Sequence, residues 1–438
     1  MDHTIPLRQR IYEMLMKSQF WPPEQMLAYQ RSQLAQLLRH AKATVPFYKT
    51  RLDVVFKKNG EIDWNRWHEI PIVTRADVRD RREQMLTTAL PPGHGPTKTF
   101  NSSGSSGIPI AMEVTQVWAY ANQAAMQRFC KIEGIVPAAP RASLASSAKD
   151  PKLLGVEYYF KQKAGRFSDT DNRAREIVLN RNLAEGRKLD ILEAEGVTSL
   201  SDFPNNIEVL AGASLARKNP VRLETIMCFG QGLTVEQRTL FRTSFGARSV
   251  SVYSSAEGGL MGFQCGDSLH YHLNPEIVLV EILDSNGGVC APGEQGRVVI
   301  TPFFNTALPL VRYEQGDGAE LLSPCACKSS LPVIANISGR QDHFMRFPEG
   351  NRSAAGLGQN FLHEKLNAIA YQLAQVETYK LELRYVPADV NKQIDPQPIV
   401  AHFRELIHPR LDVVLKPVAQ VPLNPGGKHQ RIVCEIPA

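Results

Sequence analysis

Apolar residues recur at helical spacing through much of the first 135 residues. The spacing predicts an amphipathic helix over Gln25–His40, with Pro46 as the breaker after it. Thr74, with Asp77 near the third helical position, predicts the start of another helix. Apolar positions on one side of Thr115–Glu133 predict a third. This part of the chain is therefore expected to be mainly helical.

Between residues 150 and 250 the pattern alternates between short apolar runs and helical spacing. Alternation of strand, helix and strand predicts an α/β domain with a largely parallel sheet. The expected helices are Asn205–Lys218 and Thr234–Phe245, the second opened by a capping box between Thr234 and Gln237, and the expected strands are Leu223–Phe229 and Ser249–Tyr253.

After about residue 265 the pattern changes to short strands separated by Gly- and Pro-containing turns. The expected strands are Ile277–Leu283, Gly296–Thr301 and Leu308–Tyr313, which predict an antiparallel β subdomain over about residues 265–340.

The pattern breaks again at Ile337–Asp342, where we place a domain boundary. Beyond it we expect helices over Asn360–Leu373 and Pro398–Ile407, and strands over Thr378–Val386 and Asp412–Val418. The fold class expected is α/β. A large N-terminal domain, residues 1–340, holds mixed or parallel sheets, helices and the β subdomain, and a small α+β domain, residues 341–438, follows.

Composition narrows the class of protein. The net charge of +6 is spread along the chain, and we interpret the one basic cluster, Arg79–Arg82, as a solvated helix face rather than a nucleic-acid site. No signal-peptide pattern and no apolar run of about 18 residues is found, so no membrane span is expected. Seven irregularly spaced cysteines do not suggest a disulfide framework, and a cytoplasmic location is expected.

The stretch Thr99–Ile110 (TFNSSGSSGIPI) is the first candidate for chemistry. Glycine lets the backbone approach a ligand closely, and serine hydroxyls and N–H groups are donors for an anion. The stretch predicts a cradle for nucleotide phosphates, with a simple Gly/Ser turn as the alternative. It is not a Walker-type loop, because no Gly-Lys-Ser/Thr follows. The residues concerned are Ser102, Ser103, Gly104, Ser105, Ser106 and Gly107.

Four further stretches carry candidate residues, each with an ordinary alternative. Glu257 follows a predicted strand in YSSAEGG and suits Mg²⁺, although a solvated loop carboxylate would look the same. Asp317 in LVRYEQGD suits ribose hydroxyls, or an Asx turn. Arg340 in GRQD suits phosphate or ribose, or a turn. Lys428 lies in PLNPGGKHQR, a glycine-rich loop or a flexible hairpin.

The order of these motifs resembles the adenylate-forming superfamily of acyl-CoA ligases, over essentially the whole chain. The short length, LLRHAKATVPFYKTRL followed by IPIVTRADVRD, and Cys-x-Cys after LVRYEQGD resemble the phenylacetate–CoA ligase branch. The resemblance implies ATP- and Mg²⁺-dependent activation of a carboxylic acid, aromatic by resemblance, to acyl-AMP. Pyrophosphate is released, and the acyl group passes to a thiol, coenzyme A.

The resemblance also implies residue roles. The serine and glycine residues of the first stretch would wrap the ATP phosphates, and Lys428 would bridge the substrate carboxylate and the α-phosphate. Asp342 would be the hinge of a mobile C-terminal domain. The remaining implied contacts are adenine for Gly230, Gln231, Gly232 and Tyr253 with Ser254 beside it, Mg²⁺ for Glu257, ribose for Asp317, and ribose or phosphate for Arg340.

Three positions depart from the pattern of the relatives. Ile108 stands where many have Lys, Ala256 where a Thr hydroxyl is usual, and His343 where an acidic residue is common. The first two departures indicate that single phosphate contacts of the relatives are missing here, and the third lies directly after the expected hinge.

Cysteine and histidine spacing in the β subdomain suggests structural Zn²⁺. Cys265, His270, Cys325 and Cys327 all fall in turn-like segments, and thiolate and imidazole groups suit a closed tetrahedral site. Similar patterns recur in the branch that the chain resembles. Four unrelated residues are the alternative.

Other functions stay open at this point. An amine could replace the thiol as the acyl acceptor. A Ser-Ser hydrolase would need a partner lysine, for which Lys98 is the only close choice, and would leave the other motifs unexplained. A nucleotide sensor without activity is disfavoured by the presence of Lys428. A homodimer is compatible with the sequence.

Overall fold

The computed structural model describes residues 5–101, 110–135, 139–145, 150–162, 175–266, 268–338, 344–348, 352–353, 362, 365–366, 368–389, 394–422 and 432–436. The chain divides into two compact units, each described here by itself. The first unit comprises Met1–Ala138, Lys163–Ala174 and Val250–Ser338. The second comprises Ala139–Gln162, Arg175–Ser249 and Gly339–Ala438. The boundary expected at residue 340 stays a prediction.

Helices of the first unit begin where the sequence predicts. The helix expected over Gln25–His40 is present as α2, and Thr115 caps α5 by accepting from the Trp118 N–H. Thr74 and Asp77 form a full capping box. These predictions are confirmed because caps are local signals. The helices are α1 (Leu7–Ser18), α2 (Pro23–Thr44), α3 (Arg75–Asp80), α4 (Arg82–Met85) and α5 (Gln116–Ile132), with 3₁₀ turns η1 (Pro46–Tyr48), η2 (Asp53–Val55) and η3 (Trp64–Glu69).

The strands of the first unit form the expected antiparallel β region. Their order is β11-β12-β13-β14-β10-β9-β8, and the paired neighbours run antiparallel. The bounds are β8 (Arg248–Ser255), β9 (Gly259–Gln264), β10 (Tyr271–Leu273), β11 (Val278–Leu283), β12 (Gln295–Pro302), β13 (Tyr313–Leu322) and β14 (Val333–Ser338).

The strand predicted over Leu308–Tyr313 is wrong. The segment is buried but irregular, and the strand begins only at Tyr313. Arg312 adopts a left-handed backbone conformation, with φ of 53°, which interrupts an extended chain. The Tyr48 hydroxyl donates to the Pro309 carbonyl and accepts from the Val311 N–H, so a side chain takes the place of a strand partner.

The stretch predicted to cradle phosphates joins two paired strands. Strands β1 (Thr97–Asn101) and β2 (Ala111–Thr115) are antiparallel, and Asn101 lies opposite Ala111. Residues 102–109 lie outside the described residues. An ordered strand therefore lies on each side of these residues, while the role of the stretch in binding stays a prediction.

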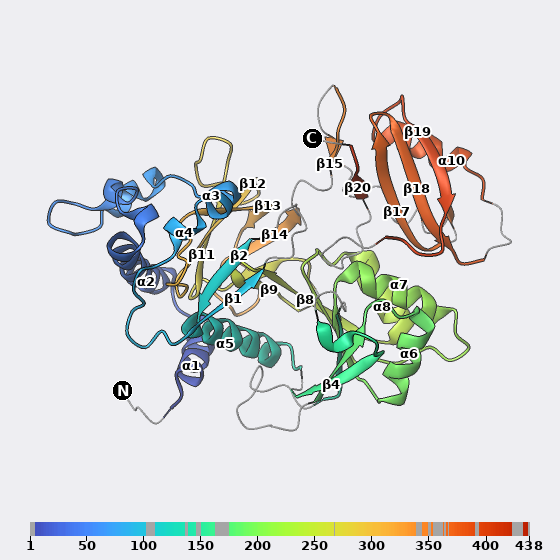
Figure 1. Cartoon of the computed structure of the whole chain (residues 1–438), viewed down its shortest axis with the longest axis horizontal. Helices are drawn as coiled ribbons and strands as arrows, with labels where there is room; N and C mark the ends of the chain where they lie inside the picture. Colours follow the sequence, from blue (N-terminus) through green and yellow to red (C-terminus); the bar gives the residue numbers. More distant parts are fainter. Residues whose placement is uncertain are drawn as a thin grey trace. The chain divides into compact units, whose positions relative to one another are not determined.

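The first part of the second unit is the expected α/β region. Its strands lie in the order β7-β6-β3-β5-β4, with β3, β5, β6 and β7 parallel and β4 antiparallel. Helices α6, α7 and α8 pack beside them (Figure 1). The bounds are β3 (Arg141–Ala145), η4 (Pro151–Leu153), β4 (Tyr158–Gln162), β5 (Arg175–Asn180), α6 (Glu185–Ala194), β6 (Ser199–Asp202), α7 (Pro204–Leu215), β7 (Thr225–Phe229) and α8 (Val235–Phe245).

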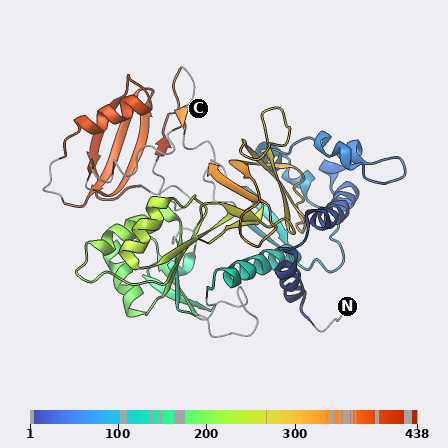
Figure 2. The ribbon, with the colours of Figure 1, turned by 180° about the vertical axis from the view of Figure 1, so that it is seen from behind.

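The C-terminal part has a small α+β structure with its own apolar core. Its sheet has the order β19-β18-β17-β20, and α10 lies across one face (Figure 2). The bounds are β15 (Phe344–Met345), β16 (Arg352–Ser353), β17 (Ala368–Glu377), β18 (Lys380–Pro387), α10 (Gln397–Leu406), β19 (Asp412–Pro417) and β20 (Ile432–Cys434).

The helix predicted over Asn360–Leu373 is wrong in its second half. Residues from Ala368 onward form β17, which pairs with β18 on one side and β20 on the other. Alanine and glutamine favour a helix locally, but pairing on both sides of the strand overrides that preference. The α/β fold class is confirmed.

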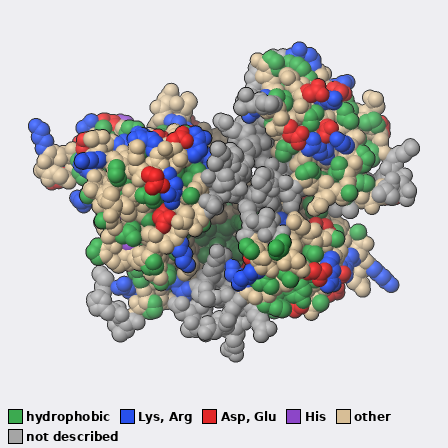
Figure 3. Space-filling model, in the orientation of Figure 1, with side chains coloured by type: hydrophobic (Ala, Val, Ile, Leu, Met, Phe, Trp, Pro, Cys, Tyr) green, Lys and Arg blue, Asp and Glu red, His purple; other side chains and the backbone are tan. Residues whose placement is uncertain are grey.

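Surface charge agrees with the interpretation of the basic cluster. Arg79 pairs with the adjacent Asp80 at 2.6 Å, and Arg82 pairs with Glu83 at 3.2 Å. On the face drawn in Figure 3, side chains of both signs are interspersed. Among the described residues, none of the helices combines the length and the apolar character needed to cross a membrane.

Candidate functional site

Tyr253 and Asp317, two predicted nucleotide-binding residues, are in direct contact in the first unit. Tyr253 lies in β8, and its hydroxyl donates to Asp317 Oδ2 at 2.8 Å. Asp317 lies in β13 where the register with β12 shifts, because Glu314 faces Val299 while Gly318 faces Arg297. Such bulges redirect side chains. The sheet thereby aims a carboxylate at the end of β8, beside an aromatic ring.

Glu257 lies four residues after Tyr253, in the turn between β8 and β9. Its side chain is only 1% exposed, and its Oε1 lies 3.3 Å from Nη1 of Arg75, which is 26% exposed. A buried carboxylate needs a compensating charge, and the guanidinium supplies it. Sequence reasoning missed Arg75, because 182 residues separate the pair.

The turn that carries Glu257 is tightly constrained. Ser255 Oγ accepts from the Gly258 N–H at 2.8 Å, and Asn122 of α5 accepts from the Leu260 N–H at 2.6 Å. Gly259 has φ of +72°, and a Cβ there would collide with Asn122. The position therefore requires glycine, and helix α5 fixes the turn.

The chemistry of Glu257 fits Mg²⁺. This ion commonly takes one or two protein carboxylates and completes its shell with water and substrate phosphates. One buried, fixed carboxylate in the turn that follows the strand of Tyr253 matches that demand. Ser254 pairs with Leu260 where β8 meets β9.

A second cluster lies in the same unit, at the other end of β9. Cys265, His272, Cys325 and Cys327 each offer a ligand atom, and these atoms lie within 4.8 Å of one another. The Cys265 and Cys325 sulfurs are 3.9 Å apart, and Cys327 Sγ is 3.3 Å from His272 Nε2. A tetrahedral Zn²⁺ site places two sulfurs about 3.8 Å apart and a sulfur and a nitrogen about 3.5 Å apart. The cluster fits zinc.

Two histidines lie beside these cysteines. His270, the residue predicted from the sequence, has Nε2 3.2 Å from Cys325 Sγ. His272, which was missed, is 2% exposed, and its Nδ1 lies 3.3 Å from the Leu331 carbonyl. A carbonyl partner at Nδ1 leaves Nε2 as the lone-pair donor, as in many metal-bound histidines. The signal was present, because alternate residues of a strand such as His-Tyr-His lie on one face.

Proximity changes the acidity of the thiols. Burial, with the neighbouring Cys327 and Cys325, raises the pKa of Cys265 to about 12. Burial acts in the same direction on Cys325, but N–H and thiol donors around its sulfur lower its pKa overall. Burial also lowers the pKa of His270 and of His272, which favours the neutral imidazole that binds metal.

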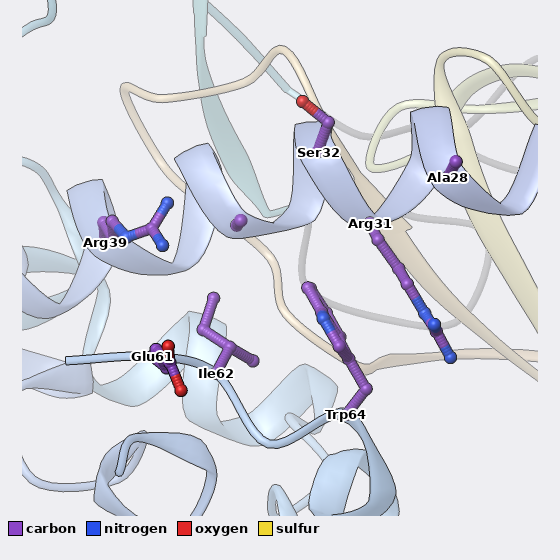
Figure 4. A pocket seen from close by; sticks show the side chains of 8 residues that line it. Ala28, Arg31, Ser32, Arg39, Glu61, Ile62 and Trp64 are labelled. Carbon is purple, nitrogen blue, oxygen red and sulfur yellow. The ribbon is translucent and has the colours of Figure 1, made fainter. Parts of the chain in front are cut away.

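A shallow cavity of about 410 Å³ lies elsewhere in the first unit, between α2 and the segment around Glu61. Figure 4 shows Arg31 and Arg39 projecting from α2 beside Glu61, Ile62 and Trp64. The Arg31 guanidinium carbon lies 5.8 Å from the centre of the Trp64 ring. None of the residues predicted to bind nucleotide lines this cavity.

Several predicted site residues cannot be placed together with these. Arg340, Asp342, Lys428 and Ser102–Gly107 lie outside the described residues, as do Ile108 and His343. Gly230, Gln231 and Gly232 follow β7 in the second unit, and Gly230 has φ of +68°. The structure thus pairs Tyr253 with Asp317 and, four residues further along the chain from Tyr253, pairs Glu257 with Arg75.

Neither the protein-family models nor the curated proteins include a match to this chain. Solved structures do match. A 2-hydroxyisobutyryl-CoA ligase in the postadenylation state, in complex with 2-HIB-AMP, has a TM-score of 0.72 at 16% identity, covering 99% of this chain and 94% of that one.

Two further solved structures match over more than half of this chain. A benzoate CoA ligase from Burkholderia xenovorans LB400 has a TM-score of 0.53 at 16% identity, covering 79% of this chain and 69% of that one. The amide bond synthetase McbA from Marinactinospora thermotolerans has a TM-score of 0.50 at 16% identity, covering 76% and 67%. The chain therefore has the fold of the adenylate-forming ligases.

Proposed function

We propose that this chain, which has the fold of the adenylate-forming ligases, activates a carboxylic acid with ATP and transfers the acyl group to an acceptor. The observation that carries the proposal is the contact between Tyr253 and Asp317, with the buried Glu257 four residues after Tyr253 in the chain. These residues follow the motif order that resembles this superfamily. In a fold shared with such ligases, they form a site for a nucleoside and its metal-bound phosphates.

Each step of the proposed reaction assigns a task to residues of this chain. A carboxylate oxygen of the acid attacks the α-phosphorus of ATP, the bond between the α- and β-phosphates breaks, and pyrophosphate leaves. Asp317 accepts hydrogen bonds from the ribose, and Tyr253 flanks the adenine. Glu257 holds Mg²⁺, which offsets charge on the phosphates. Ser102–Gly107, Gly230–Gly232, Arg340 and Lys428 complete the proposed site.

In the second step the acceptor attacks the acyl carbon and AMP leaves. We propose coenzyme A as the acceptor, because most of the matching structures named here are CoA ligases. An amine is the second candidate, since an amide bond synthetase shares the fold. We propose an aromatic acid as substrate, in line with the benzoate CoA ligase. Small hydroxy acids are the second class of substrate to test, because one of the matching structures contains 2-HIB-AMP.

We further propose that the cysteine and histidine cluster holds structural Zn²⁺. Its ligands are Cys265, Cys325 and Cys327, with His272 as the fourth and His270 beside it. The ion would fix the segment after β13 to β10, next to the strand that carries Asp317. The Ser330 N–H donates to the Gln19 carbonyl at 2.8 Å, which ties the same segment to the end of α1.

The direct test measures pyrophosphate release across aryl, aliphatic and hydroxy acids, with ATP, Mg²⁺ and either coenzyme A or a panel of amines. Release that depends on the acid, ATP and Mg²⁺ is expected, and mass spectrometry of the products identifies the acceptor. ADP and phosphate as products would contradict an adenylate-forming reaction.

Lys428 tests the proposal that a mobile C-terminal domain serves both steps. Lys428→Ala is expected to slow adenylation by about 100- to 1,000-fold, the scale for loss of one charge-stabilising donor. Conversion of supplied acyl-AMP to product should suffer far less, because another face of the domain then meets the site. Stopped-flow assays of the two half-reactions measure this. Equal damage to both would contradict rotation about Asp342.

A further inference from the structure

We propose that Arg75 is a positioning residue which competes with Mg²⁺ for the Glu257 carboxylate, so that the metal enters the site together with ATP and not alone. This inference rests on the proposed function. Its starting point is the 3.3 Å ion pair between Arg75 Nη1 and Glu257 Oε1.

The ion pair is built into the fold rather than formed by two mobile surface chains. Val73 bridges to Tyr313 of β13: its N–H donates to the Arg312 carbonyl, and its own carbonyl accepts from the Glu314 N–H, both at 2.9 Å. Thr74 then caps α3 through its capping box with Asp77. Arg75, the next residue, is thereby fixed to the strand that carries Asp317.

The side chains of Arg312 and Arg51 hold the segment that precedes Arg75. The Arg312 guanidinium donates to the carbonyls of His68 and Ile70, at 2.6 and 2.9 Å. Arg51 donates to the Ile72 carbonyl at 2.9 Å. The backbone before Arg75 is thus held at three carbonyls, and this fixes where the Arg75 side chain begins.

The two partners differ in burial, which decides how the pair responds to a metal. Glu257 is 1% exposed and its turn is fixed by Asn122, whereas Arg75 is 26% exposed. The guanidinium can therefore move toward solvent, while the carboxylate stays. Since both cations compensate the same buried charge, binding of one weakens binding of the other.

Phosphates change this balance. Mg²⁺ alone would have to displace the Arg75 guanidinium from the Glu257 carboxylate. It would gain few new ligands in return. Mg²⁺ bound to ATP brings phosphate oxygens with it and needs a single protein carboxylate. The displaced guanidinium can in turn pair with an anion. The ion pair therefore makes metal uptake depend on the nucleotide.

The experiment uses the full-length protein with its native metal content and measures Mn²⁺ binding by electron paramagnetic resonance, with Mg²⁺ competition. Arg75→Gln is expected to bind Mn²⁺ at least about tenfold more tightly than wild type without nucleotide, because the substitution removes a cation that competes for the buried carboxylate. Arg75→Lys keeps a cation and should restore weak binding. Arg79→Gln, on the same helix and paired with Asp80, is the matched control and should change nothing.

Two results would overturn the inference. One is equal Mn²⁺ affinity in wild type and Arg75→Gln, and the other is a gain that persists in the double variant with Glu257→Gln. If Arg75→Gln does not fold, wild type alone decides, because Glu257-dependent Mn²⁺ binding that is as tight without nucleotide as with it would contradict competition. These measurements need no turnover. Failure of pyrophosphate release would therefore reject the proposed function separately.

Discussion

Two candidate sites lie at the two ends of β9, and they differ in how their acidic groups are compensated. Glu257 lies two residues before the strand and Cys265 directly after it, so the strand's six residues, about 20 Å, separate them. At the first end, carboxylates meet an arginine and a tyrosine hydroxyl. At the second, thiols meet thiols and imidazoles.

The difference shows how each site is kept stable. The Glu257 charge is balanced by Arg75, which the protein supplies. Thiolates held 3.9 Å apart repel each other, so they need either protons, as the raised pKa of Cys265 indicates, or a cation. Under the proposals above, the first end would exchange its cation during a reaction cycle, whereas the second would gain stability by keeping one.

The largest expected effect is a loss of activity, and it is expected for a substitution at the Glu257 end of β9. Glu257→Gln should reduce acid-dependent pyrophosphate release by about 100- to 1,000-fold, because a charge-stabilising group at the phosphates is lost. The zinc content should stay at the wild-type value. Glu83→Gln, an exposed carboxylate paired with Arg82, is the control. A loss of zinc in Glu257→Gln would contradict the prediction that the two sites are independent.

The next effect acts at the other end and on stability. Cys325→Ser should remove zinc and lower the free energy of unfolding by about 3 kcal/mol, because three remaining ligands hold the ion poorly. Metal analysis and thermal unfolding measure both. Cys434→Ser, outside the cluster, should leave zinc unchanged. Full zinc content in Cys325→Ser would remove this residue from the site.

A smaller effect distinguishes the two histidines. His272→Gln should weaken zinc binding by about 100-fold, whereas His270→Gln should weaken it by about tenfold or less, because His272 alone has the carbonyl partner at Nδ1 in the described contacts. Competition with a chelating dye measures the two affinities. The reverse order would restore the histidine expected from the sequence.

The smallest effect concerns the tyrosine. Tyr253→Phe removes the hydrogen bond to Asp317 but keeps the ring, so KM for ATP should rise about fivefold with little change in kcat, as expected from about 1 kcal/mol. Steady-state kinetics measures both constants. An unchanged KM would mean that the hydroxyl does not orient Asp317 for the ribose.

Local signals in the sequence were sufficient for much of this molecule. The caps at Thr74 and Thr234 were predicted because each depends on residues three positions apart. The antiparallel strands after residue 265 followed from alternation and turn residues.

Long-range contacts were not available from such patterns. The run Leu308–Tyr313 is apolar like a strand, but Tyr48 supplies its hydrogen bonds from far away in the chain. The segment around Arg75 was used for its resemblance and for the helix start at Thr74, and Glu257 was interpreted as a metal ligand or a solvated loop carboxylate. No local pattern joins residues 182 positions apart.

Helix α5 contacts β9 at two points, and the distance between these points along the helix matches the distance along the strand. Asn122 bonds to the Leu260 N–H near the start of the strand, and the Arg128 guanidinium lies over the Phe263 ring, 5.6 Å from its centre. Six helical residues rise about 9 Å, and three strand residues about 10 Å. One residue inserted between Asn122 and Arg128 would rotate one contact by about 100° relative to the other. The length of this interval is therefore fixed, and natural or engineered variants of the protein can change in sequence there but not in number of residues.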